Sequence, residues 1–242
     1  MGVAIDPGRT AGVDGDVVQA LLGVVDRLQA IDQRTALQGH RRTIGVYPRV
    51  GPRKPHRERQ VEEHFVAARN HSASLFPALE KARALVEHVD LVAVGLGPGS
   101  YAGVRIAIAA ALGLEWSLGA RLVGLPSVAA LEVAAREFVV IGDARRETFY
   151  FTRVAEGGCV EGPLLATAQE LAARLAECGA LPLYAAAEVP GFPAAEIVLP
   201  SAVLLARFAA HGRGLVTTGD LEPIYLREPH ITRPRSDIPR LP

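Results

Sequence analysis

The spacing of apolar positions switches between strand-like runs and helical repeats along most of the chain. The continuous apolar run at residues 91–96 is typical of a strand buried on both faces. A long helix is predicted after it, from about residue 104 to 118, and Arg121–Leu125 predicts a second strand. Because strands and helices alternate in this way, the pattern places the chain in the α/β class.

Further elements are predicted on both sides of these strands. A helix capped by Ser72 or Ser74 is expected before the first strand, because Leu75, Leu79 and Ala82 follow at helical spacing. The remaining elements are a helix at 127–135, a hairpin of 138–142 with 148–154, and helices at 168–177 and 202–211. The sequence shows no internal repeat.

The first 59 residues follow a different pattern. Residues 3–6 predict a strand, and apolar positions over residues 17–31 recur at helical spacing. Residues 41–59 are basic and rich in proline, which predicts an exposed or disordered loop. The basic side chains are Arg41, Arg42, Arg49, Arg53, Lys54, Arg57 and Arg59, against the single acid Glu58.

Composition limits the classes of partner and the cellular location. Basic and acidic residues both number 26 in the 242 residues, so no global field favours nucleic acid or a membrane surface. The two cysteines, Cys159 and Cys178, provide neither a disulfide scaffold nor a zinc cluster. No uncharged apolar stretch reaches the roughly 18 residues that a membrane span requires. We therefore expect a cytoplasmic protein.

Candidate chemistry is weak at every motif. The sequence GPGSYA at 97–102 fits a loose dinucleotide pattern, but the next strand ends at Pro126 without an acid, and Pro98 lacks an amide hydrogen. We therefore interpret residues 97–102 as a tight turn rather than a dinucleotide site. Ser100 does not stand in a nucleophile elbow, and the histidines are scattered. Asp143 and Glu147 could form an acid–base pair, but Arg145 and Arg146 lie between them, so a charged hairpin turn is the simpler interpretation.

Six short motifs, in a fixed order from about residue 61 to 227, carry a resemblance. His71-Ser72 opens a helix, GPGSYAGVR follows at 97–105, and a helix of small residues occupies 106–114. GLPSVAAL at 124–131, DAR at 143–145 and EPIYLR at 222–227 complete the series. In this order the motifs resemble the TsaB family, which belongs to the tRNA threonylcarbamoyladenosine machinery and was formerly grouped with glycoprotease-like proteins. No nucleophile–base pair supports the older endopeptidase label.

The resemblance implies the actin-like ATPase fold, with two lobes related to ribonuclease H. Under this expectation, residues 1–59 are an atypical N-terminal region, 60–120 the remainder of the N-terminal lobe, and 121–242 the C-terminal lobe, whose last residues return toward the first. The N-terminal region is either an inserted segment or a misread start that lacks the first strands of its lobe. As an insertion, its basic segment would contact tRNA phosphates.

The resemblance also implies partners and a division of labour. TsaB proteins pair with TsaD, the catalytic subunit, and with TsaE, a small ATPase, while tRNA is reached through the complex. The metal-binding histidine element of TsaD corresponds here to residues 126–130, which include no such ligand. The expected function is a non-catalytic subunit without its own cofactor, with ATP and metal on the partners. The alternatives are an ATP-dependent enzyme of the same superfold and a tRNA-binding module acting through Arg41 to Arg59.

The predicted partner surface is centred on the helix that follows the glycine-rich turn. Its apolar residues occupy more than one face, and its alanines keep it thin, so a second helix can approach closely. The alternative is a helix buried wholly within one domain. A homodimer of the chain alone is also compatible with the family. The predicted interface residues are His71, Ser72, Leu75, Gly97, Pro98, Gly99, Ser100, Tyr101, Gly103, Val104, Arg105, Ile108, Ala109 and Leu112.

Overall fold

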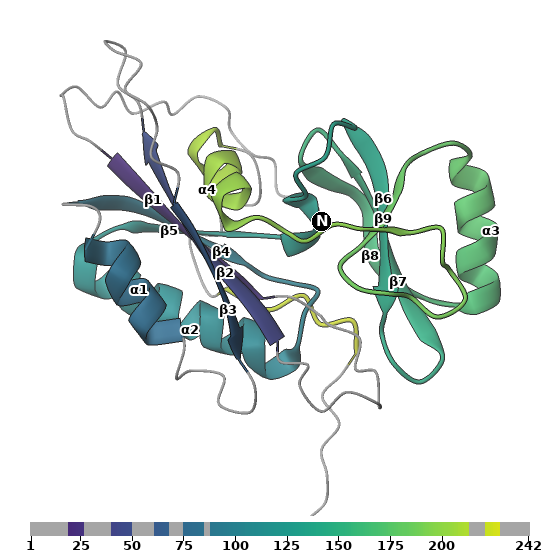
Figure 1. Cartoon of the computed structure of the whole chain (residues 1–242), viewed down its shortest axis with the longest axis horizontal. Coiled ribbons are helices and arrows are strands. Elements are labelled where there is room, and N and C mark those ends of the chain that lie inside the picture. Colours follow the sequence, from purple (N-terminus) through teal and green to yellow (C-terminus); the bar gives the residue numbers. More distant parts are fainter. Residues whose placement is uncertain are drawn as a thin grey trace, which may run out of the picture.

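Two five-stranded sheets lie side by side and form the two lobes of the molecule (Figure 1). This computed structural model describes residues 19–26, 40–49, 61–67, 75–84, 88–212 and 221–227. The first sheet has the order β3-β2-β1-β4-β5. Its strands are β1 (Gln19–Asp26), β2 (His40–Arg49), β3 (Val61–Ala67), β4 (Val89–Gly95) and β5 (Arg121–Leu125).

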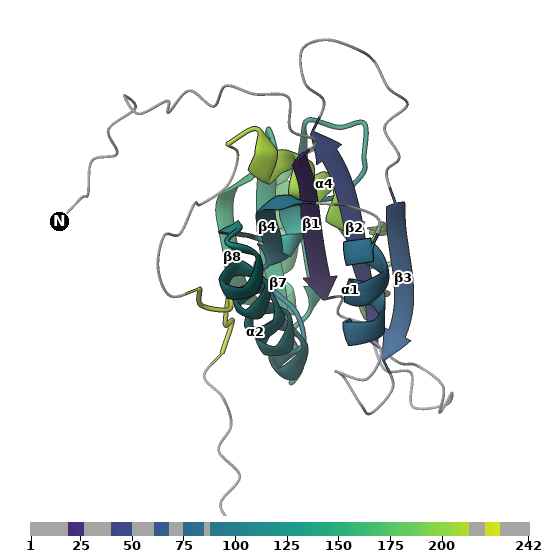
Figure 2. The same cartoon turned by 90° about the vertical axis from the view of Figure 1, so that its left-hand side faces the viewer.

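Helices cover both faces of the first sheet. Helices α1 (Leu75–Ala84) and α2 (Tyr101–Leu118) lie side by side on one face, and α4 (Ala202–Ala210) packs on the other (Figures 1 and 2). Strand β4 alternates between these layers: Val92 and Val94 pack with α1 and α2, whereas Leu91 and Ala93 pack with α4. The strand is therefore buried on both faces, as its continuous apolar run predicts.

The second sheet has the order β10-β9-β6-β7-β8, with helix α3 (Ala168–Cys178) on one face. On its central strand, Val139 and Ile141 pack toward the α3 side, whereas Phe138 and Val140 pack toward the turn after β5. The strands are β6 (Glu137–Asp143), β7 (Thr148–Ala155), β8 (Gly158–Thr167), β9 (Leu183–Ala185) and β10 (Glu196–Ile197).

The two lobes repeat one topology. In the first sheet, β1, β2 and β3 form an antiparallel meander, and β4 and β5 add in parallel beside β1. In the second, β6, β7 and β8 form the meander, and β9 and β10 add in parallel beside β6. This duplication is invisible in the sequence, which has no repeat. It confirms the expected α/β class and the two-lobe actin-like ATPase fold.

The N-terminal region departs from two predictions. The helix expected over residues 17–31 is wrong, because β1 lies there and pairs with β2 and β4. A short apolar run of this kind does not distinguish a buried strand from a helix, and the ladder bonds on both sides decide it. The basic loop expected from Arg41 is also wrong as far as Arg49, because β2 pairs with β1 and β3. The choice between an inserted segment and a misread start stays a prediction. Residues 3–6 and 50–60 lie outside the described residues.

Two further expectations need correction. The helix predicted over 127–135 is only the short 3₁₀ turn η1 (Ser127–Ala129), because the Ala130 carbonyl accepts the N–H of Ser201 and Leu131 pairs with Pro200. The expected lobe boundary at residue 121 is too early, since β5 belongs to the first sheet and α4 also packs on it. Strands β3, β8, β9 and β10 were not predicted. The strands predicted at 91–96 and 121–125, the hairpin, and helices α1, α2, α3 and α4 are confirmed.

Candidate functional site

The glycine-rich turn after β4 is fastened to the turn after β5. The Gly97 N–H donates to Ser127 Oγ at 3.2 Å, and the Ser127 N–H donates back to the Gly97 carbonyl at 2.8 Å. Gly97 has φ of +102°, and an added Cβ would lie 2.9 Å from the Gly99 nitrogen, so this position requires glycine. The Gly97 amide is therefore used within the protein itself.

The first turn of α2 is also capped by hydrogen bonds within the protein. Ser100 Oγ accepts the Gly103 N–H at 3.1 Å, and the Ser100 carbonyl accepts the Val104 N–H at 3.0 Å. With Gly97 N–H also occupied and Pro98 lacking an amide hydrogen, this turn presents few free donors to a phosphate. The geometry supports a packing turn.

Two kinds of group bear on possible chemistry at the described residues: metal ligands and cysteine thiols. The described residues contain no group of three or more His, Cys, Asp or Glu side chains that could hold a metal. Ser127, Val128 and Ala129, which the resemblance equates with part of the metal element of TsaD, are buried, and their side chains are not histidine or carboxylate ligands. Burial raises the pKa of the Cys159 thiol to about 11, which disfavours the nucleophilic thiolate.

Helix α2 has two apolar faces, as its sequence predicts. Val104, Ala107, Ile108 and Ala111 are buried in the core of the first lobe. The opposite face is exposed and ends at Trp116, whose side chain is 84% exposed. The alternative of a helix buried wholly in one domain is therefore wrong.

Helix α2 is also the one described helix that is long and apolar enough to cross a membrane. That feature is weak evidence for a membrane segment, because the covering helices of globular folds pass the same test. Here Arg105 and Glu115 interrupt the apolar stretch, and the inner face packs on the first sheet.

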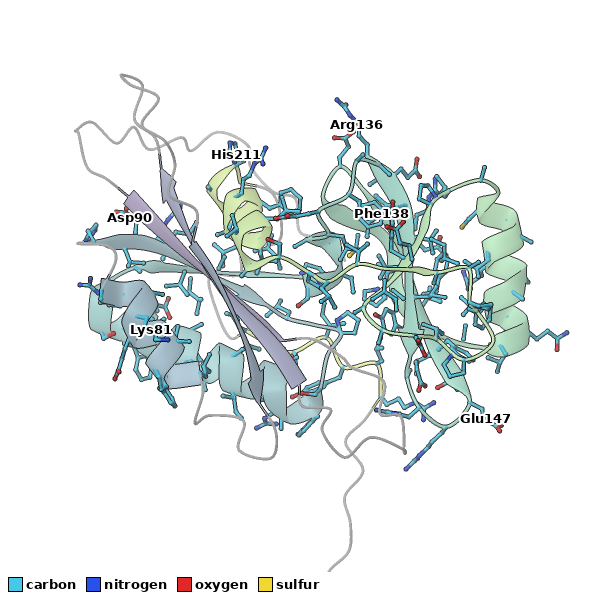
Figure 3. All side chains as sticks on the ribbon, viewed as in Figure 1. Lys81, Asp90, Arg136, Phe138, Glu147 and His211 are labelled. Carbon is cyan, nitrogen blue, oxygen red and sulfur yellow. The ribbon has the colours of Figure 1, made fainter. Side chains whose placement is uncertain are left out.

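An apolar groove of about 530 Å³ runs between α1 and α2. Phe76 of α1, 54% exposed, lies along it, and Ala109 and Gly113 of α2 are small enough to leave its space open. Figure 3 shows Lys81 on the same helix as Phe76. The residues that line the groove are Phe76, Leu79, Glu80, Arg83, Ile106, Ala109, Ala110, Gly113 and Leu114.

The structure separates the predicted interface residues into three sets. Tyr101, Arg105 and Ala109 are exposed, and Gly99, Ser100 and Leu112 are half-buried, so these side chains can reach a partner. The second set is buried and supports the surface without touching a partner: Leu75, Gly97, Pro98, Gly103, Val104 and Ile108. The third set, His71 and Ser72, lies outside the described residues.

Sequence reasoning missed two exposed aromatic side chains, Phe76 in the groove and Trp116 on the outer face of α2. Phe76 immediately follows the buried Leu75, and Trp116 stands on the face of α2 that carries Arg105 and Ala109. The available signal was the helical spacing of residues 105, 109 and 116, combined with the presence of one tryptophan in the chain.

Comparisons with known proteins agree with this architecture. Residues 65–187 match the family model described as "TsaD: tRNA N6-adenosine threonylcarbamoyltransferase". An uncharacterized protein of Mycobacterium tuberculosis is 32% identical over 173 residues, which is 69% of this chain and 80% of the relative.

Solved structures share the fold over most of the chain. A crystal structure of a Pseudomonas aeruginosa protein, described as similar to the peptidase YeaZ, superposes with a TM-score of 0.63 at 23% identity. A structure of YeaZ from the same organism has a TM-score of 0.56 at 22% identity. Each match covers 86% of this chain and 100% of the other. At these identities the likeness shows the fold.

Proposed function

Because the chain belongs to the TsaB (YeaZ) family, whose role is in tRNA modification, we propose that it is a non-catalytic subunit that pairs with a TsaD-type threonylcarbamoyltransferase. The observation that carries this proposal is the apolar groove between α1 and α2, which Phe76 lines, together with the exposed Trp116 on the outer face of α2. Exposed apolar surface of this kind is typical of a protein–protein contact.

The chemistry of the groove suits a helix of a partner protein. Ala109 and Gly113 allow close approach of a second helix, and the large apolar side chains can anchor it. Glu80 and Arg83 also line the groove, where charged side chains can fix the orientation of the partner. A specific complex needs more than about 1,000 Å² of buried surface, so the contact would extend along both helices.

The remaining expectations follow from the same proposal. ATP and the catalytic metal belong to the partner subunits, a TsaD-type transferase and a TsaE-type ATPase, and the complex works in the cytoplasm, where its tRNA substrate is found. In the absence of its partner, the same groove offers a surface for a second copy of the chain.

Co-expression with the TsaD-type protein of the same organism tests the proposal. The wild-type chain should elute with it as one complex in size-exclusion chromatography. Ala109→Arg places an unpaired charge in the groove and should weaken the complex by at least about 100-fold. Ala173→Arg, at an exposed alanine of α3, is the matched control and should leave the complex intact. A wild-type chain that forms no complex, or an Ala109→Arg chain that still forms it, would refute the proposal.

A further inference from the structure

The segment 221–227 crosses from the first lobe to the second along the side of the molecule where α2 begins (Figure 1). Leu221 and Ile224 pack in the core beneath α1 and α2, and the Ile224 N–H donates to the Leu96 carbonyl at 2.8 Å. Leu226 packs against the core of the second lobe. Arg227 then donates to the Arg145 carbonyl at 3.2 Å and to the Thr148 hydroxyl.

The residues that alternate with these buried ones are directed toward the surface. Tyr225, 43% exposed, stacks on Tyr101 of α2 with ring centroids 5.3 Å apart. Arg105 lies over the Tyr101 ring at 5.2 Å and donates to its hydroxyl at 2.8 Å. A hydrogen bond with Tyr225 is the main cause that raises the pKa of Arg105. The two tyrosines and the arginine therefore form one exposed cluster.

Arg227 extends this cluster to the β6–β7 turn. In that turn Arg145, Arg146 and Glu147 all have positive φ, between 52° and 69°, a conformation that is unfavourable for residues other than glycine. The turn is held because Asp143 Oδ1 accepts the Arg145 N–H at 2.7 Å and because Arg227 binds the Arg145 carbonyl. Arg145 and Arg146 of this turn are both exposed.

We propose that this cation and aromatic cluster, which we term the terminal ridge, binds the phosphates and unpaired bases of RNA. The inference rests on the role of the family in tRNA modification and adds a contact surface on this subunit. The terminal ridge consists of Tyr101, Arg105, Arg145, Arg146, Tyr225 and Arg227.

The composition of the ridge favours RNA over an acidic peptide. Guanidinium groups pair with phosphates through two parallel hydrogen bonds, and exposed aromatic rings stack with unpaired bases. Two acids share the turn: Asp143 is engaged by Arg145, at 3.7 Å between their charged groups, and Glu147 lies at its tip (Figure 3). Because the whole chain has no net charge, attraction for RNA must come from a local cluster such as this one.

The ridge is distinct from the groove between α1 and α2, although α2 contributes to both. Tyr101 opens the helix, whereas the groove lining on α2 begins at Ile106, five residues later and about 7.5 Å along the axis. The groove continues beyond it to Leu114, toward the other end of α2. RNA binding at one end of α2 and partner binding along the rest can therefore be broken separately.

Fluorescence anisotropy with a labelled tRNA anticodon stem-loop tests the inference, using the full chain alone and in complex with the TsaD-type subunit. The double substitution Arg145→Ala with Arg146→Ala, at two exposed residues outside the predicted partner interface, should weaken binding by at least about tenfold. It should also lower the slope of log affinity against log salt by about 1.4, the value for two lost phosphate contacts to a single strand. Tyr225→Ala should weaken binding without changing that slope.

Arg136→Ala is the matched control. Its side chain is 86% exposed and lies at the opposite end of the second lobe from Glu147 (Figure 3). The inference is overturned if the wild-type chain binds no RNA in either form, if the double variant binds like wild type, or if Arg136→Ala has the same effect. It is also overturned if a poly-glutamate peptide displaces the RNA at equal concentration, because the surface would then be a protein site.

Size-exclusion chromatography of the same variants separates this inference from the proposed function. Loss of RNA binding in a double variant that still assembles with the TsaD-type subunit supports both. Loss of RNA binding in a chain that never assembles supports the ridge and refutes the partner. Unchanged RNA binding in a double variant that still assembles supports the partner and refutes the ridge.

Discussion

Helices α2 and α3 cover one face of equivalent sheets, yet they differ in what they leave on the outside. In α3 only Leu171 is buried, and the exposed residues include Gln169, Glu170 and Glu177. All of its residues are described, and it exposes no large apolar side chain. Helix α2 buries a full inner face and still presents alanine, glycine and Trp116 outward.

The contrast indicates which outer surface needs no partner to cover its apolar residues. Helix α3 covers its sheet and presents a polar surface to water, as a surface helix of a globular protein does. Helices α1 and α2 cover theirs and leave an apolar groove in addition. Covering the sheet does not require the second apolar face of α2, so that face needs another explanation, and the proposed partner would supply it.

Exposed apolar residues elsewhere do not form a comparable surface. In the second lobe they are Val160 and Leu165 on β8 and Ile197 on β10. These two strands form opposite edges of the second sheet. Scattered apolar residues are ordinary on protein surfaces, whereas Phe76 and the groove beside it are contiguous.

The largest expected effect concerns α3 and the stability of its lobe. Leu171→Ala removes the one buried side chain of α3 and should lower the free energy of unfolding by about 2–5 kcal/mol. Urea denaturation measures this loss. The folded fraction should still bind the TsaD-type subunit with wild-type affinity. A weakened complex at temperatures where the variant is fully folded would contradict the separation between the two helices.

The next effect concerns α2 and changes the affinity for the TsaD-type subunit rather than the stability of the chain. Trp116→Ala should weaken the complex about 10–100-fold, because a large aromatic anchor is removed from the contact. Since the side chain is 84% exposed in the free chain, the free energy of unfolding should change by less than about 0.5 kcal/mol. Calorimetric titration and thermal unfolding give the two values. An unchanged affinity would exclude Trp116 from the interface.

The smallest expected effect is the pH dependence of the stability that Glu170 of α3 contributes. The backbone N–H and hydroxyl of Thr167 bond to the Glu170 carboxylate and lower its pKa below the usual 4.5. A lowered pKa stabilises the folded state above about pH 4.5, and this stabilisation is lost as the pH falls through the folded-state value. Glu170→Gln should therefore unfold at a slightly lower temperature than wild type at pH 7, with the gap closing toward pH 3. A gap that persists at pH 3 would contradict this origin.

The sequence predicts the core of the fold well where motif and periodicity agree. β4, α2 and β5 have continuous or helical apolar patterns, and the glycine-rich turn between the first two fixes their boundaries. β1 was mistaken for a helix because its apolar run is short and its assignment depends on pairing with strands distant in the sequence. The helix expected at Ser127 was overridden by the hydrogen bond from Ser201, which no local pattern reveals.

The candidate site was predictable only in part. The two-faced character of α2 follows from its sequence, but the face of each residue depends on how the helix sits on β4. Val104 and Ile108 therefore proved to be core residues, whereas Phe76 and Trp116 were missed. The terminal ridge needed the structure, because it joins residues of α2, the β6–β7 turn and segment 221–227.

Hydrogen exchange of the chain, free and mixed with the TsaD-type subunit, tests the central claim most directly. The account predicts that binding slows exchange in α1 and α2, residues 75–84 and 101–118, and leaves α3, residues 168–178, unchanged. Protection confined to α3, or absent from both α1 and α2, would contradict it.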